Sequence, residues 1–502
     1  MTQTSILDKA PQATPALLGI GTFFLMMLAG SALLNDPDTY WHIATGRWIL
    51  ENGAIPSTDP FSHTMTGSDW HAHEWAAAMM LAGAHSLAGW TGVVLAAAFA
   101  FSLTLGLFAW GLSTYLRPLY VVILVAIAFV GISHHLVARP HVLVMPVLML
   151  WLVLLVFARS RGTRPPLAAA LLMIPWANMH GSFPIGLALG GVLALEALLD
   201  QSDREGRLKV IRDWGLFLAL ATAAACATPY GVQGFLFPFH IGGMDKSFKW
   251  IMEWHPPNFR EFPPVEVWLM VVLGAVFVRG LKVPVLRLVV CLGLLHLALS
   301  HVRMAEYLIF ISSLLLAPVI AAQWRDAPRD PDPAPLSEGT WTRLRIAACG
   351  LLTAGLAVLV VTDIAPSDRK SPVAALAVAR QAGLTDRPVF NEYNFGGYLI
   401  YEGIPTFIDG RADMYGDAFL DRTLTAATDP LASPTLSALL KEHGIGWTLL
   451  AVNDVSARLL DKDPAWQEIY RDHIAVIHVP ATGRETLADI RKPMGFPGSV
   501  QQ

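Results

Sequence analysis

Long apolar runs separated by short polar loops fill residues 1–362 of the chain. A helix needs about 20 mostly apolar residues to cross a bilayer. The pattern predicts a bundle of about 11 transmembrane helices, near 16–34, 88–113, 118–133, 142–158, 167–178, 183–199, 213–227, 265–278, 283–300, 304–323 and 344–362. Polar residues 178–182 interrupt one pair of runs, which therefore also fits a re-entrant hairpin.

The pattern changes beyond residue 362, where charged residues are frequent and apolar segments are short. Short β-type runs begin at 389, 406, 446 and 474, and helical patterns lie near 370–383, 416–426, 434–443, 455–462 and 464–471. Alternation of strands and helices is typical of an α/β domain. We therefore expect a transmembrane domain at 1–362, with a first outside loop at 35–73, and an α/β domain at 363–502.

Composition supports a membrane protein. The chain has 502 residues, of which 54% are hydrophobic and only 15% are charged. Soluble domains carry about a quarter charged residues, so this chain has too little charge to cover the surface of a soluble protein. The net charge of -4 argues against binding of nucleic acid. The fold class predicted is a polytopic α-helical membrane protein with a C-terminal α/β domain.

Basic residues in the loops predict the orientation. Cytoplasmic loops are enriched in Lys and Arg, and this enrichment is found at 159–164 and 204–212 if the N-terminus is cytoplasmic. An odd number of spans then places the C-terminal domain outside. The alternative for the first run is a signal peptide cleaved near Ala29–Ala32, but its length favours a retained anchor.

The first outside loop opens with Asp36-Pro37-Asp38 directly after the first predicted span. Two carboxylates held close by a proline suit a shared divalent cation, Mg or Mn, or a base beside a metal. Asp38 also suits the N-cap of a helix starting at Thr39. Asp36 has no such structural task in the sequence, which favours it as the catalytic member.

The rest of this loop contains further candidates. Residues 39–52 combine aromatic and polar positions, which is typical of an interfacial helix. Its His42 and Arg47 are candidate substrate-binding residues, and Arg47 suits either a phosphate or snorkelling to the headgroups. At the end of the loop, His73 and Glu74 are acid/base or binding candidates. His73 and Glu74 do not form a zincin motif, because that motif needs two histidines at positions i and i+4 of a helix.

Later outside loops add isolated polar residues next to the bilayer, where ionisable groups are functional candidates. Arg139 and Arg303 are candidates for a phosphate, because arginine binds phosphate in a bidentate manner. His180 and Glu253 complete the predicted substrate-binding set of these loops. The alternative for the arginines is a bond to a lipid headgroup or an acidic loop residue.

In the C-terminal domain, polar residues gather where the first two predicted strands end. Asn391, Asp409 and Arg411 are the main members. Ligands bind at this edge in open α/β sheets, so we include them as substrate-binding candidates. The alternative is a polar network that holds the turns.

Several segments together resemble the GT-C class of membrane glycosyltransferases, which includes protein O-mannosyltransferases and catalytic subunits of oligosaccharyltransferases. The similarity is carried by blocks of a bacterial GT-C-like set at Asn35–His42, Asp59–Ser62, His73–Trp75, Ala138–His141, Trp176–Gly181, Glu253–Trp254, Phe390–Tyr398 and Phe407–Gly416. The chain lacks the Trp-Trp-Asp acceptor motif of oligosaccharyltransferases, and its first-loop motif is not the Asp-Glu pair of O-mannosyltransferases.

The resemblance implies a function and a location. It implies transfer of a sugar from a polyprenyl-phosphate-linked donor to a protein, glycan or lipid acceptor on the outer face of the bacterial inner membrane. A first-loop carboxylate then acts as the base or binds a divalent metal, and Asp36 and Asp38 match that position. Glu74 is a further catalytic candidate. The alternatives are a noncatalytic assembly or binding protein on the same scaffold and a transporter of lipid-linked sugars.

Overall fold

The computed structural model describes residues 13–133, 136–244, 249–327, 338–362 and 364–481. The chain forms two compact units. The helical unit comprises Met1–Leu33, His73–His240 and Ile251–Ala365. The mixed unit comprises Leu34–Ala72, Ile241–Trp250 and Pro366–Gln502. The first loop, which the sequence pattern groups with the transmembrane domain, therefore folds with the C-terminal segment.

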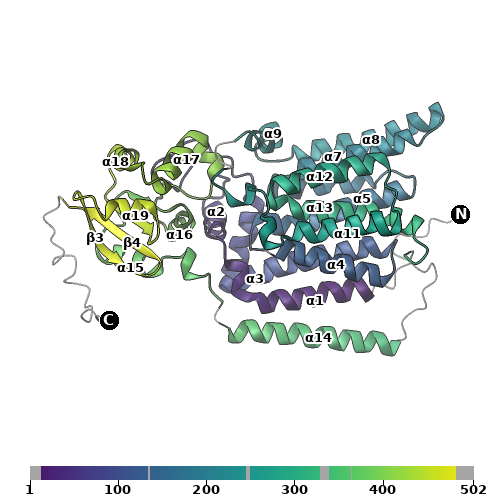
Figure 1. Cartoon of the computed structure of the whole chain (residues 1–502), viewed down its shortest axis with the longest axis horizontal. Helices are drawn as coiled ribbons and strands as arrows, with labels where there is room; N and C mark the ends of the chain where they lie inside the picture. Colours follow the sequence, from purple (N-terminus) through teal and green to yellow (C-terminus); the bar gives the residue numbers. More distant parts are fainter. Residues whose placement is uncertain (1–12, 134–135, 245–248, 328–337, 363, 482–502) are drawn as a thin grey trace. The chain divides into compact units, whose positions relative to one another are not determined.

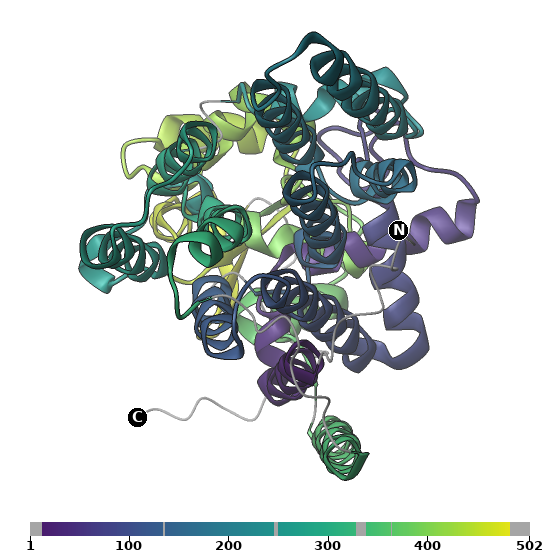
Figure 2. The ribbon, with the colours of Figure 1, turned by 90° about the vertical axis from the view of Figure 1, so that its right-hand side faces the viewer.

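The helical unit consists of apolar helices and short connecting turns (Figure 1). Figure 2 views several of these helices nearly end-on. The helices are α1 Ala13–Ala29, α3 Trp75–Ser113, α4 Pro118–Ser133, α5 Pro140–Ser160, α6 Met173–Met179, α7 Phe183–Leu199, α8 Arg204–Ala225, α9 Val232–Ile241, α11 Pro264–Arg279, α12 Val285–Ser300, α13 Ala305–Gln323 and α14 Glu338–Val361. The 3-10 turns are η1 Gly30–Leu34, η2 Leu167–Leu172, η3 Met252–Trp254, η4 Phe259–Glu261 and η5 Val302–Met304.

Within the described residues, five helical segments are long and apolar enough to cross a membrane: Ala13–Leu34, Trp75–Ser113, Pro140–Ser160, Val302–Gln323 and Trp341–Val361. Five shorter apolar helices of 10–17 residues accompany them. The prediction of a helical membrane protein is confirmed at this level, and the count of 11 spans stays a prediction. Helix α3 begins earlier than the predicted run at 88, because a kink at Ala88 and Gly89 joins two helical segments.

A buried cluster of ion pairs connects α5, α7 and α12. The guanidinium of Arg287 donates from Nε to Glu196 Oε1 at 3.0 Å and from Nη1 to the carbonyl of Leu315 at 2.7 Å. Arg159 Nε lies 3.2 Å from Glu196 Oε2. Because buried charges require partners, this cluster gives Glu196 a structural task inside the bundle.

The mixed unit has a four-stranded sheet in the order β1-β2-β4-β3. Strands β1 (Val389–Asn391) and β2 (Trp447–Ala451) are parallel, whereas β4 (Ala475–Pro480) is antiparallel to both β2 and β3 (Trp466–Arg471). Its helices are α2 Asp38–Asn52, α15 Val373–Gln381, α16 Gly396–Tyr401, α17 Ala412–Thr428, α18 Ser433–Glu442 and α19 Val455–Leu460, with the turns η6 Asp368–Lys370 and η7 Tyr393–Phe395. Helices separate β1, β2 and β3 along the chain, whereas β4 follows β3 directly.

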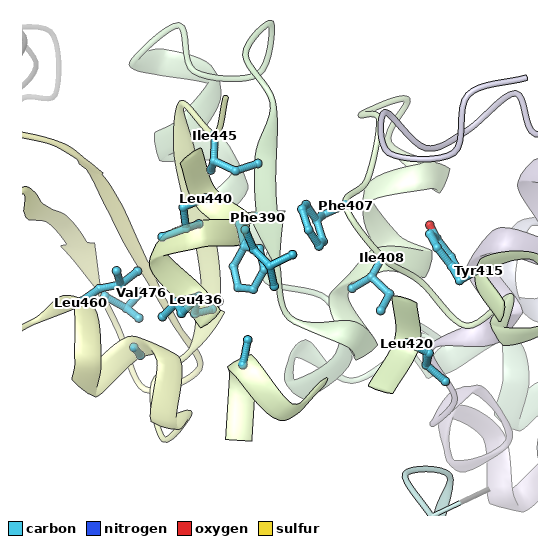
Figure 3. Close-up of a cluster of buried hydrophobic side chains, with 14 residues drawn as sticks. Phe390, Phe407, Ile408, Tyr415, Leu420, Leu436, Leu440, Ile445, Leu460 and Val476 are labelled. Carbon is cyan, nitrogen blue, oxygen red and sulfur yellow. The ribbon is translucent and has the colours of Figure 1, made fainter. Parts of the chain in front are cut away.

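The core of this unit lies between the sheet and its helices. The ring centroids of Phe390 and Phe407 are 4.8 Å apart, edge to face. Leu436 and Leu440 of α18 and Val476 of β4 belong to the same cluster (Figure 3). This packing fixes the chain around residues 391–411, where the polar candidates lie.

Two predicted elements of this unit are wrong. Residues 464–471, predicted as a helix, contain strand β3, whose register shifts between Glu468 and Tyr470. This irregularity breaks the strict alternation by which a strand is recognised. Residues 406–409, predicted as a strand, form no ladder and make one isolated bridge, from Thr406 to Ser62. The chain there is held by side chains instead.

Helix α2 is a packed helix, which corrects the prediction of an interfacial one. Most of its residues are buried, including Tyr40, Trp41 and His42. The Tyr40 ring lies edge-on to the rings of Tyr398 and Tyr401 at centroid distances of 5.3 and 5.2 Å. The aromatic residues of α2 therefore face protein within the mixed unit.

Candidate functional site

Two arginines and one carboxylate converge in the helical unit. Arg139 immediately precedes α5, where Pro140 starts the helix, and Arg303 lies in η5 before α13. Arg139 Nη1 forms an ion pair with Glu253 Oε1, and Arg303 Nη1 lies 3.5 Å from Glu253 Oε2. Each arginine thus approaches a different oxygen of one carboxylate, so three of the sequence candidates come together.

The segment with Glu253 is fixed to the start of η5. His301 Nδ1 lies 2.8 Å from the carbonyl oxygen of Trp254. The backbone N–H of Val302 donates to the carbonyl of His255 at 2.9 Å. The guanidinium of Arg303 also lies 5.0 Å from the centre of the Trp254 ring, a cation–π arrangement. These contacts hold both arginines at a defined place although they come from distant parts of the chain.

A small cavity adjoins this cluster and is lined by His141, Glu253, Arg303 and Glu306. Its volume of about 10 Å³ is that of a single water molecule. The sequence analysis did not select His141 and Glu306 as site residues. Glu306 is an acidic residue in the first turn of the apolar helix α13, and an ionisable group in that position is a signal for function.

His73, Glu74 and His180 form a second group in the same unit. Glu74 Oε1 lies 3.8 Å from Nε2 of His73 and 3.8 Å from Nε2 of His180. The His180 ring lies 6.4 Å, centroid to centroid, from that of His141, which lines the cavity. The group and the cavity are therefore neighbours through these two rings.

The environment keeps His180 neutral. Its Nδ1 lies 2.9 Å from the hydroxyl of Ser182 and accepts the backbone N–H of Ser182 at 3.2 Å. Burial lowers the pKa of His180 well below its ordinary value, and Arg303, His141, His73 and Arg139 act in the same direction. An acceptor role for Nδ1 leaves the proton on Nε2, the nitrogen near Glu74.

In the mixed unit, the acidic motif has a different geometry from the one predicted. Helix α2 begins at Asp38 itself, and Asp36 Oδ1 accepts the backbone N–H of Asp38 at 2.8 Å. Asp36 therefore binds a backbone N–H at the start of this helix, which is the role that the sequence analysis gave to Asp38. Asp36 is 8% exposed, so its carboxylate is largely removed from solvent.

Two candidates in α2 are also held by aromatic groups. The guanidinium of Arg47 lies 4.4 Å from the centre of the Tyr401 ring and donates to the Tyr401 hydroxyl at 3.2 Å. His42 is 2% exposed and its ring lies 3.6 Å from that of Trp41. Among the described residues, the indole N–H of Trp41 is buried and has no hydrogen-bond acceptor.

Asn391, Asp409 and Arg411 are buried and bonded to other protein groups. Arg411 Nε and Nη2 donate to the two oxygens of Asp409 at 2.8 and 2.7 Å, and Nη1 donates to Asp59 Oδ1 at 2.6 Å. Burial alone would raise the pKa of Asp409, but the charge and hydrogen bonds of Arg411 hold that pKa below its ordinary value. These hydrogen bonds fit the turn-holding role that the sequence left as the alternative.

One group of potential metal ligands occurs among the described residues, in the mixed unit. The ligand atoms of Asp461, Glu468 and His478 lie within 4.8 Å of one another. Arg471, however, donates to Asp461 Oδ1 at 2.7 Å and to Glu468 Oε2 at 2.8 Å. The two carboxylates therefore already share one guanidinium, which makes this group an ion-pair cluster.

No protein-family model matches the chain, and no curated protein matches it. Solved structures do. ArnT from Cupriavidus metallidurans bound to undecaprenyl phosphate is similar at 14% identity and a TM-score of 0.46, over 93% of this chain and 97% of ArnT. ArnT in the apo state is similar at 13% identity and a TM-score of 0.45, over 92% and 96%.

The oligosaccharyltransferase of Archaeoglobus fulgidus in the apo form is similar at 10% identity and a TM-score of 0.49, over 87% of this chain and 69% of that protein. At these identities, what the site does has to be argued from its side chains.

Proposed function

We propose that the protein transfers a sugar from a polyprenyl-phosphate-linked donor to an acceptor on the outer face of the bacterial inner membrane. The observation that carries the proposal is the convergence of Arg139 and Arg303 on the two oxygens of Glu253. Two guanidinium groups that converge on one carboxylate are suited to a phosphate, because phosphate and carboxylate present similar acceptor oxygens to arginine.

In the proposed reaction, an acceptor hydroxyl attacks the anomeric carbon of the donor sugar. A bond forms between that carbon and the acceptor oxygen, and the bond to the phosphate oxygen breaks. The lipid phosphate leaves with the bonding electron pair, and Arg139 and Arg303 stabilise its charge. The hydroxyl proton passes to the carboxylate of Asp36. Glu74, with His73 and His180, orients the sugar.

Asp36 and Asp38 also fit a divalent cation. Mg²⁺ is commonly bound through one or two carboxylates, with water and substrate phosphates as its other ligands. One oxygen of Asp36 also accepts the Asp38 N–H. When bound, Mg or Mn would supply Lewis-acid stabilisation of the phosphate.

The proposed arrangement in the membrane follows the sequence. About 11 spans, with the N-terminus in the cytoplasm, place the domain at 363–502 in the periplasm. The donor lipid then lies in the bilayer beside the outside loops that carry Arg139, His180, Glu253 and Arg303. His42 and Arg47 of the first outside loop are further members of the proposed binding set.

The test is turnover of labelled polyprenyl-phosphate-linked sugars by the purified protein with candidate acceptors, with and without a chelator. Asp36→Asn and Asp38→Asn are expected to abolish transfer while the protein folds normally. Glu51→Gln, an exposed carboxylate of α2, is the matched control and is expected to keep wild-type activity. Full activity of both aspartate variants would overturn the proposal, and folded wild-type protein without any turnover would favour a noncatalytic binding role.

A further inference from the structure

The loop at residues 406–411 is fixed by buried polar side chains. The amide of Asn391 donates from Nδ2 to the carbonyl of Ile408 at 2.8 Å, and its Oδ1 accepts the N–H of Phe407 at 2.8 Å. Asp409 accepts hydrogen bonds from Arg411 and, at 2.7 Å, from the hydroxyl of Tyr415. Since these groups are excluded from solvent, each lost bond would leave a buried polar atom unsatisfied. The loop is therefore rigidly held.

The first loop is joined to the same segment. Arg411 pairs with Asp59, and its guanidinium lies 4.7 Å from the ring centre of Trp70. The N–H of His63 donates to the carbonyl of Thr406 at 3.0 Å, and the hydroxyl of Thr64 donates to the carbonyl of Phe407 at 2.7 Å. These contacts attach residues 59–70 of the first loop to the 406–411 loop.

Two glycines bring this framework directly against the acidic motif. A Cβ atom at Gly410 would lie 2.0 Å from Asp38 Oδ1 and 3.0 Å from Trp41 Nε1. A Cβ atom at Gly397 would lie 2.2 Å from the carbonyl oxygen of Pro37. Only a residue without a side chain allows such an approach. The main chain at Gly410 therefore packs directly against the Asp38 carboxylate.

The two contacts differ in what a methyl group would displace. At Gly397 the obstacle is backbone, so an alanine would force the Asp36–Asp38 turn to move. At Gly410 the nearest atom is the end of a side chain, which is able to rotate away. Alanine at Gly410 therefore turns the Asp38 carboxylate out of its place and leaves the surrounding fold largely intact.

From these contacts we infer that Gly410 is a positioning residue for Asp38, and that the buried network of Asn391, Asp409 and Arg411 holds Gly410 in that place. The C-terminal segment then sets the geometry of the acidic motif without touching the substrate. This inference rests on the proposed sugar transfer for its catalytic meaning. The contact between Gly410 and Asp38 is testable without activity.

The experiment is a double-mutant cycle on the full-length protein, with the wild type, Gly410→Ala, Asp38→Ala and the combination. Thermal unfolding and turnover of a labelled polyprenyl-phosphate-linked sugar are measured on all four. Gly410→Ala is expected to lower kcat on the order of 100-fold, because a displacement of about 1 Å has that effect. Its KM for the donor is expected to stay near the wild-type value.

The cycle also separates positioning from a general loss of structure. Once Asp38 has been truncated to Ala, the Gly410→Ala change has no carboxylate to displace and is expected not to lower the melting temperature further. Gly191→Ala in α7, where a Cβ meets nothing within 4 Å, controls for glycine replacement. Wild-type kcat in Gly410→Ala, or equal losses of melting temperature with and without Asp38, would overturn the inference.

The two proposals fail in different ways. If the folded wild type transfers no sugar from any donor, the proposed function fails. The melting temperatures of the four proteins then still test the contact between Gly410 and Asp38. Non-additive changes in melting temperature support the contact, and additive changes contradict it.

Discussion

Arg411 and Asp59, which are 352 positions apart in the chain, form an ion pair from which solvent is fully excluded. Their distance is 2.6 Å between Nη1 and Oδ1. Because Asp409 binds the other side of the same guanidinium, Arg411 stands between two carboxylates from different parts of the sequence. The pair is a buried polar link between the first loop and the C-terminal segment within the mixed unit.

Asp59→Asn is expected to destabilise the mixed unit by about 3 kcal/mol, since removal of one partner leaves a buried charge less well compensated. The free energy of unfolding of the purified protein measures this change. Glu442→Gln, which removes the partner of Arg422 in an exposed pair, is the control and is expected to leave stability unchanged. An equal, small effect of both substitutions would contradict a stabilising role for the buried pair.

Arg303→Lys is expected to raise the KM for the lipid-linked donor about tenfold with a small change in kcat, which corresponds to about 1.4 kcal/mol. Lysine keeps the charge but loses the planar donor pair that fits a phosphate. Steady-state kinetics over a range of donor concentrations distinguishes the two constants. Arg260→Lys, in an exposed turn, serves as control. An unchanged KM for Arg303→Lys would exclude Arg303 from phosphate binding.

His180 makes stability depend on pH in one direction. Its pKa in the fold lies well below the ordinary value of 6.5, chiefly because of burial. The unfolded chain therefore binds more protons between these two values, so the stabilisation is complete above pH 6.5 and is lost as the pH falls toward the folded pKa. The melting temperature of the wild type is expected to fall over this window.

His180→Gln is expected to flatten that dependence, whereas His240→Gln, at an exposed position, is expected to leave it unchanged. Melting temperatures of the three proteins between about pH 5 and 8 provide the comparison. If the melting temperatures of the wild type and His180→Gln change with pH in parallel, then His180 titrates alike in the folded and unfolded states.

Asp454 gives the opposite dependence. Burial raises its pKa to about 6 from 3.8, although its carboxylate accepts the N–H of Ala451. The folded state thus binds the proton more tightly, and stability falls as the pH rises from 3.8 to about 6. Asp454→Asn keeps the acceptor oxygen and is expected to raise the melting temperature at pH 8 but hardly at pH 4. A uniform shift at both pH values would contradict this account.

Local patterns predicted the elements of the fold whose residues follow a regular period. The β2 and β4 strands are short buried apolar runs, and α2 follows a proline and an acidic residue that are typical of helix starts. Strand β3 was missed because its irregularity near Ile469 places apolar residues at a spacing that resembles a helix. Such an irregularity depends on the partner strand, which a local pattern does not contain.

The candidate site was predictable in its residue types but not in its grouping. Arg139, Glu253 and Arg303 were selected singly as polar residues beside a bilayer, and only the structure brings them onto one carboxylate. Conversely, Asp409 and Arg411 look like ligand-binding residues by type. The long-range pairing of Arg411 with Asp59, which supports a framework role for Asp409 and Arg411, has no local trace in the sequence.

The link between Asp59 and Arg411 also has a consequence for biogenesis. At 5–20 residues per second, the ribosome needs roughly 20–70 s to add the 352 residues between them. The first loop emerges early but lacks its cationic partner for all of that time. A truncated chain that ends before Arg411 would leave Asp59 permanently without this cation.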